Sequence, residues 1–208
     1  MRNAIPRTCE AIVTIPAEGK EEFIELVEQW EDELIREYDG IEDNIRLEAT
    51  EVTCPATEMP EDVQDFLIHA ITICPHGVYR MIPEMPEVVE TSNNLSAIAT
   101  ENNVVNVLCL TRSSVEARKE ELQEIIQSTF SLAGAEVEFS GAYPGWKPNF
   151  KSRLLKTMQA VYEKEFGKAA NVITIHAGLE CALFSINYPH LDMISFGPTI
   201  EHPHSPDE

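Results

Sequence analysis

Basic residues are scarce in this sequence. The 208 residues include 15 Lys+Arg against 36 Asp+Glu, so the formal net charge is −21 at pH 7. Binding to nucleic acid or to an anionic membrane surface needs a stripe of basic side chains, and no such stripe occurs here. We therefore expect neither nucleic acid nor a membrane among the partners.

Cysteine pairs and long apolar runs are also lacking. The five cysteines are scattered singly without a Cys-x-x-Cys pair, which argues against a disulfide framework and a cysteine zinc site. No window approaches the about 20 consecutive apolar residues of a membrane helix, and residues 1–10 lack a signal-peptide core. Since 43% of the residues are apolar, the sequence predicts a soluble, cytoplasmic protein with one large domain or two small ones.

Periodicity predicts a mixed α/β fold in the first part of the chain. Helical spacing indicates an acidic helix within residues 21–34, whose charged face is read as solvated surface, and a second helix within 63–71. Ser113 and Glu116 form a Ser-x-x-Glu capping box for a third helix. Strand patterns occupy residues 8–15, 45–52, 78–82, 95–100, 104–111 and 135–139, with a turn at 101–103.

The stretch from Gly141 to Pro148 breaks all periodicity and predicts a domain boundary. Beyond it, a helix over 154–162 ends at Gly167, and short apolar runs at 172–175 and 193–196 are typical of parallel-sheet strands. Such a layered domain commonly needs about 100 residues or more. We therefore expect an incomplete parallel-sheet α/β segment in this part.

A turn containing Gly178 leads from the run at 172–175 into a helix start. Unpaired N–H groups at a helix start attract anions and glycine lets a ligand approach, although a purely structural turn is the alternative. His176 and Glu180 stand four residues apart and could share a metal ion, but a structural histidine is the preferred interpretation of so isolated a pair. Cys181 is a conceivable nucleophile without a supporting residue.

Two other candidate sites lie at strand ends. His202 and His204 follow the run at 193–196, where open α/β sheets hold ligands, so metal binding and an exposed tail both remain open. Arg112 ends an apolar strand just before a helix. Its guanidinium could clamp a carboxylate bidentately, or it could form an ordinary salt bridge with one of the many acids.

Several unusual stretches together resemble the aminoacyl-histidine dipeptidases of the metallopeptidase M20 family. They are GAYPGWKP at 141–148, HAGLEC at 176–181 and SFGPTIEHPHSPDE at 195–208, with RNAIPR at 2–7, ETSNNL at 90–95 and TRSS at 111–114. In that family a lid domain interrupts a two-zinc catalytic domain. The resemblance implies a lid or dimerisation-type domain at 1–141, with helices on a mostly antiparallel sheet, and the C-terminal portion of the catalytic domain at 142–208.

The resemblance also implies site roles within a metal-dependent dipeptidase that hydrolyses dipeptides with a C-terminal histidine. Two zinc ions would activate the attacking water, with His204 as the metal ligand from this chain. Arg112 and the Gly178 backbone would hold the substrate carboxylate, and Asn3 would lie near its peptide group. No catalytic residue is expected within the chain, because the general base and the other metal motifs precede the lid in the family. The 208 residues alone are therefore expected to be inactive.

Some positions depart from the family pattern. Ala182 replaces a usual glycine, Glu201-His202-Pro203 replaces an Arg-Gly-Ala-like stretch, and the lid histidine that stabilises the oxyanion is absent. Two alternatives stay open: a non-catalytic lid-type interaction or dimerisation module, for which a homodimer is one expected assembly, and a small α/β binding protein. The upstream reading frame would discriminate these hypotheses from the dipeptidase.

Overall fold

The computed structural model describes residues 2–83, 85–142, 144–146, 149, 151–173, 179–197 and 201. The chain forms two compact units. One is Thr8–Glu61, and the other combines Met1–Arg7 with Asp62–Glu208. In the part of the chain that is described, no helix is long and apolar enough to cross a membrane.

The unit Thr8–Glu61 is built around one helix. A 3-10 turn, η1 (Ala17–Gly19), leads into α1 (Lys20–Glu37), the predicted acidic helix. Residues 8–15 and 45–52, in contrast, have no regular secondary structure, so both strand predictions are wrong. A strand forms only where another strand pairs with its backbone, and this fully described unit contains no strand.

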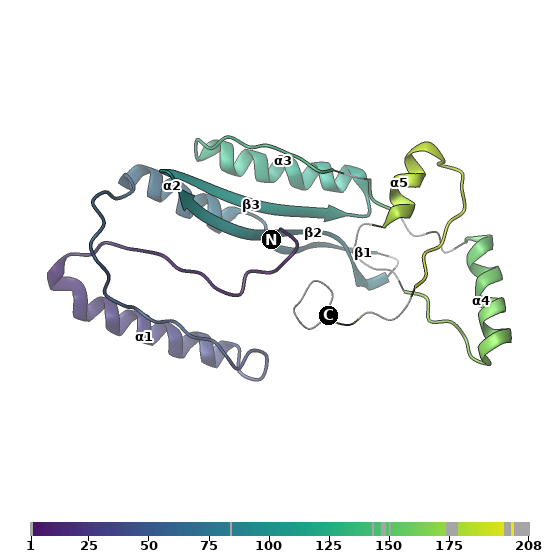
Figure 1. Ribbon diagram of the computed structural model, residues 1–208, viewed down its shortest axis with the longest axis horizontal. Helices are drawn as coiled ribbons and strands as arrows, with labels where there is room; N and C mark the ends of the chain where they lie inside the picture. The colour runs from purple at the N-terminus through teal and green to yellow at the C-terminus, as the bar shows by residue number, and fades with distance from the viewer. Residues whose placement is uncertain are drawn as a thin grey trace. The chain divides into compact units, whose positions relative to one another are not determined.

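The other unit contains a three-stranded antiparallel sheet in the order β1-β2-β3 (Figure 1). The strands are β1 (Gly77–Ile82), β2 (Met85–Glu101) and β3 (Val104–Ser113). Asn102 and Asn103 form the predicted turn between β2 and β3, with φ values of 51° and 61°. Asparagine tolerates this left-handed conformation better than most residues with a β-carbon, and the two-residue type I′ hairpin turn requires it at both positions.

Two helices pack on one face of this sheet. They are α2 (Glu61–Ile73) and α3 (Glu116–Leu132), both predicted from their spacing. Leu122, Ile126 and Phe130 of α3 form a buried cluster with Ala70 and Cys74, and Leu95, Val107 and Cys109 of the strands pack against it. Figure 1 shows α3 lying along β3. This cluster is the core against which β3 packs through Val107 and Cys109.

The start of α3 differs from the predicted capping box. Val115 occupies the cap position, while the Ser113 hydroxyl accepts a hydrogen bond from the Val115 N–H at 3.0 Å. Glu116 instead pairs with Lys119, at 2.7 Å between Oε1 and Nζ. The Ser113 hydroxyl also contacts the Thr91 hydroxyl of β2, and this tertiary contact keeps Ser113 at the end of the strand.

The residues after 141 form two helices, α4 (Arg153–Phe166) and α5 (Glu180–Asn187). The Ser152 hydroxyl caps α4 by accepting from the Leu155 N–H at 2.9 Å, and α4 ends at Gly167, as predicted. Residues 135–139, 172–173 and 193–196 contain no strand, which corrects those predictions for the described residues. The mixed α/β fold class, with helices on an antiparallel sheet, is confirmed.

Candidate functional site

Arg112 is the centre of the candidate site. It is the second-last residue of β3, where it pairs with Ser92 of β2, and its side chain is half-buried. Its Nη2 group donates a hydrogen bond to Oδ1 of Asn3, which is 109 positions away in the sequence. The structure therefore brings together two of the residues that the sequence comparison with the family singled out.

Asn94 of β2 holds the N-terminal segment in this place. Its Nδ2 group donates to the Arg2 carbonyl oxygen at 3.2 Å and to the Ala4 carbonyl oxygen at 2.8 Å. Its Oδ1 atom is buried and accepts no hydrogen bond within the described part of the chain. Asn94 belongs to the stretch 90–95, which carried the resemblance without an assigned role. The resemblance of this stretch to the family was therefore the one sequence feature that could have indicated the support for Asn3.

A cavity of about 270 Å³ lies beside β3. Arg2, Arg112, Ser113, Lys119 and Trp146 are among its lining residues. Lys119 is an unusual member because its side chain is only 9% exposed and it pairs with Glu116. Two arginines and a lysine thus surround a cavity of small-molecule size, in a protein whose overall charge is strongly negative. Glu136 and Glu138 line the same cavity, so its wall carries charges of both signs, and the Arg112 guanidinium is the lining group whose geometry suits a carboxylate.

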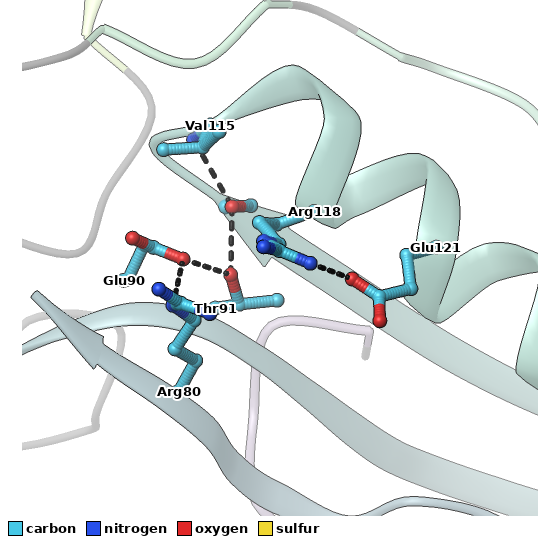
Figure 2. Close-up of polar contacts among 7 residues, drawn as sticks. Arg80, Glu90, Thr91, Val115, Arg118 and Glu121 are labelled. Carbon is cyan, nitrogen blue, oxygen red and sulfur yellow. Dashed lines mark hydrogen bonds and ion pairs between the residues drawn. The ribbon is translucent and has the colours of Figure 1, made fainter.

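A chain of polar contacts runs from β1 to the start of α3, as Figure 2 shows. The Arg80 Nε atom lies 3.0 Å from Oε1 of Glu90, whose side chain is only 8% exposed. The Thr91 hydroxyl lies 3.4 Å from that oxygen and 2.8 Å from the Ser113 hydroxyl. Arg118 and Glu121 form a separate pair at 2.5 Å. The contacts from Arg80 to Ser113 reach the residue directly after Arg112.

Two thiols in the same unit interact with each other: Cys74, which is buried, and Cys109 of β3, which is partly buried. The hydrogen bond with Cys109 raises the pKa of the Cys74 thiol far above its ordinary value. The same bond, together with a hydrogen bond from Asn93, lowers the pKa of Cys109 to about 7 although burial opposes this. Asn93 also donates to the Pro75 carbonyl oxygen at 2.7 Å and accepts from the Thr111 hydroxyl at 3.1 Å. Periodicity alone gave no sign of this buried polar group.

The other predicted site residues divide into those outside and those inside the described part of the chain. Gly178, His176, His202 and His204 lie outside the described residues, so their roles stay predictions. Glu180 begins α5, and the Cys181 thiol lies 3.9 Å from the Ile194 carbonyl oxygen. Among the described residues, no group of three His, Cys, Asp or Glu side chains could hold a metal ion. The described residues therefore do not form a zinc site by themselves.

Comparison with known proteins adds two relatives, whereas no family model matches the chain. The chain is 37% identical over all 208 residues to the cytosol non-specific dipeptidase of Escherichia coli (strain K12), and it covers 43% of that protein. The crystal structure of aminoacylhistidine dipeptidase from Vibrio alginolyticus matches 93% of the chain with a TM-score of 0.83 and 44% identity, over 39% of its own length. The chain thus spans less than half the length of either relative.

Proposed function

Because the chain belongs to the family of these M20 dipeptidases, we propose that it forms the part of a dipeptidase that binds the substrate carboxylate. The observation that carries this proposal is the hydrogen bond between Arg112 and Asn3 beside the cavity. The cytosolic location in the relative's name is proposed for this chain too.

Arg112 has the chemistry for this role. A guanidinium offers five N–H donors in a planar fork, so one such group can bind an amide oxygen and a carboxylate at the same time. A dipeptide presents a terminal carboxylate that can accept two parallel bonds, each strengthened by the opposite charges. The Asn3 side-chain amide lies beside the guanidinium. From there it can contact the peptide group next to the carboxylate of the same substrate. We propose dipeptides with a C-terminal histidine as the substrate class.

The hydrolytic centre proposed for the whole enzyme contains two zinc ions. When bound, such a pair activates a water molecule and polarises the scissile carbonyl. His204 is the proposed ligand from this chain. Since a catalytic zinc commonly takes three protein ligands, we expect the purified 208-residue chain to bind zinc weakly and to hydrolyse no dipeptide.

The direct test is a chimera in which these 208 residues replace the matching segment of the Escherichia coli dipeptidase. The zinc-loaded chimera should hydrolyse a dipeptide with C-terminal histidine, and it should prefer the free acid to the C-terminal amide. Arg112→Ala should remove most of that preference, about ten- to a hundredfold, because a charge-assisted hydrogen bond is worth about 1.5–3 kcal/mol. A folded, zinc-loaded chimera without activity, or an unchanged acid-to-amide ratio in Arg112→Ala, would contradict the proposal.

A dimerisation module is a second candidate, because α1 leaves several large apolar side chains exposed. They are Leu26, Trp30, Leu34 and Ile35. If this face pairs two copies, the chain should sediment as a dimer and a Trp30→Glu variant as a monomer. A monomeric wild-type chain at about 100 μM, well above the Kd of a stable dimer, would argue against this candidate.

A further inference from the structure

Several contacts from other parts of the chain converge on the corner that follows Arg112. We define this corner as residues 113–115, where β3 ends and α3 begins. Two contacts tie the corner to β2: the Ser114 N–H donates to the Glu90 carbonyl oxygen at 3.0 Å, and the Ser113 hydroxyl contacts the Thr91 hydroxyl at 2.8 Å. A movement of this corner would therefore move the end of β3 and Arg112 with it.

The side-chain bonds at the corner form a relay with a single consistent direction. The Val115 N–H donates to the Ser113 hydroxyl. That hydroxyl can then donate to Thr91, and the Thr91 hydroxyl donates to the Glu90 carboxylate, which also accepts from Arg80. Glu90 is 6% exposed and Thr91 is fully buried, so water cannot readily replace either partner. The buried carboxylate thus lies at one end of this chain of contacts, and the 2.8 Å contact between the two hydroxyls is its closest link.

Gly145 packs directly against the backbone of the corner. A β-carbon at this position would lie 2.5 Å from the Ser113 carbonyl oxygen and 2.6 Å from the Ser114 carbonyl carbon. Both separations are far inside ordinary van der Waals contact, so any other residue would push the corner backbone away. Gly145 belongs to the stretch 141–148, which periodicity could interpret only as a break. The close contact between Gly145 and the corner backbone therefore requires a residue without a β-carbon at this position.

We propose that Glu90, Thr91 and Gly145 are positioning residues that set the place of the Arg112 guanidinium through the corner. This inference rests on the proposed function of Arg112. Among the described residues, β2 is the one strand that pairs with β3, so the strand ladder restrains Arg112 from one side. Beside the Asn3 contact, the relay and Gly145 supply further restraint. A carboxylate clamp needs such restraint, because a displacement of about 1 Å can cost about a hundredfold in rate.

The test begins with the 208-residue chain, independently of any activity. The Nε–Hε NMR signal of Arg112, assigned through its loss in Arg112→Lys, reports the surroundings of the guanidinium. Thr91→Val keeps the side-chain volume and removes the hydroxyl, so this signal should shift and its hydrogen exchange should quicken by about tenfold, as expected for one buried hydrogen bond. Thr91→Ser should restore the wild-type signal. Gly145→Ala should shift it as well.

A matched control is Thr129→Val, since the Thr129 hydroxyl also makes one part-buried hydrogen bond, to the Ile125 carbonyl oxygen at 2.8 Å. This substitution should leave the Arg112 signal unchanged. If Thr91→Val fails to fold, Glu90→Gln weakens the same relay with the side-chain size conserved. An unchanged Arg112 signal in a folded relay variant and in Gly145→Ala would overturn the proposal.

The acid-to-amide assay of the chimera separates this inference from the proposed function. Thr91→Val should raise KM for the free acid by about fivefold to tenfold with a smaller change in kcat, since one buried hydrogen bond is lost. If Arg112→Ala loses the preference while Thr91→Val and Gly145→Ala keep it, the positioning roles fail and the proposed function stands. If Arg112→Ala keeps the preference, the proposed function itself fails, whatever the NMR signal shows.

Discussion

The two compact units differ in how much apolar surface each buries. The unit Thr8–Glu61 contains one buried residue, Val27, and leaves Ile12, Trp30 and Val52 between 48% and 64% exposed. The other unit buries a cluster that joins two helices to the sheet. Amphipathic patterns are present in both. The comparison teaches that such a pattern becomes a core only where a second layer packs against it.

The largest expected effect comes from a matched pair of leucines. Leu122 is 0% exposed in the core cluster, whereas Leu26 of α1 is 38% exposed. Leu122→Ala should lower the free energy of unfolding by about 2–5 kcal/mol, because it removes buried surface and leaves a cavity. Leu26→Ala should cost less than about 1 kcal/mol. Urea unfolding measures both, and equal losses would show that the two units do not differ in this way.

Asparagine offers a polar version of the same comparison. Asn93 is 2% exposed and joins the Pro75 carbonyl to the Thr111 hydroxyl, whereas Asn44 is exposed. Asn93→Ala should destabilise by about 1–3 kcal/mol because the Pro75 carbonyl oxygen loses its buried donor. Asn44→Ala should change stability by at most about 0.5 kcal/mol. A neutral Asn93→Ala, measured by the same unfolding curves, would mean that water reaches this group.

Thiol chemistry should separate the units more modestly. The pKa of Cys109 is lowered to about 7, so its alkylation rate should rise to half of its maximum near pH 7. The exposed Cys54 of the other unit serves as the comparison thiol in the same experiment. Peptide mass spectrometry after timed alkylation measures each site. Cys74→Ala should move the Cys109 midpoint upward, and an unchanged midpoint would show that Cys74 has no part in it.

The smallest expected effect concerns Asp192. Hydrogen bonds from the Leu154 N–H first, then the Ser152 hydroxyl, lower its pKa in the folded protein. Its stabilising contribution is therefore present above the ordinary carboxyl pKa and is lost as pH falls through the folded-state value. Asp192→Asn should lower Tm slightly at pH 7, and the difference from wild type should shrink at pH 3. A difference that grows as pH falls would contradict this assignment.

Local patterns in the sequence predicted the helices and the β2–β3 hairpin well. The Asn102-Asn103 turn and the Gly167 helix end depend on the conformational preferences of single residues, so both could be read directly. The strands predicted at 8–15 and 193–196 were wrong for the opposite reason. A strand depends on a neighbour that supplies hydrogen bonds, and alternation within one segment carries no information about that neighbour.

The candidate site was partly predictable. Arg112 stood out at the end of a strand, but only the family resemblance connected it with Asn3, because residues 109 positions apart share no local pattern. The relay through Glu90 and Thr91 was not predicted. Local spacing predicted that the Ser113 hydroxyl caps a helix. In the structure this hydroxyl contacts the Thr91 hydroxyl and accepts a hydrogen bond from the Val115 N–H. Polar contacts of this kind depend on strand register, which the sequence does not state.

The central claim is that Asn3 and Arg112 act as one unit on the substrate carboxylate. A double-mutant cycle in the zinc-loaded chimera tests it most directly, with the acid-to-amide ratio of kcat/KM as the measured quantity for wild type, Asn3→Ala, Arg112→Ala and the double variant. If Asn3 acts by orienting the guanidinium, Asn3→Ala should lower the ratio in the presence of Arg112 and have no further effect in its absence. Equal, independent effects of Asn3→Ala in both backgrounds, or no effect of Arg112→Ala, would contradict the account.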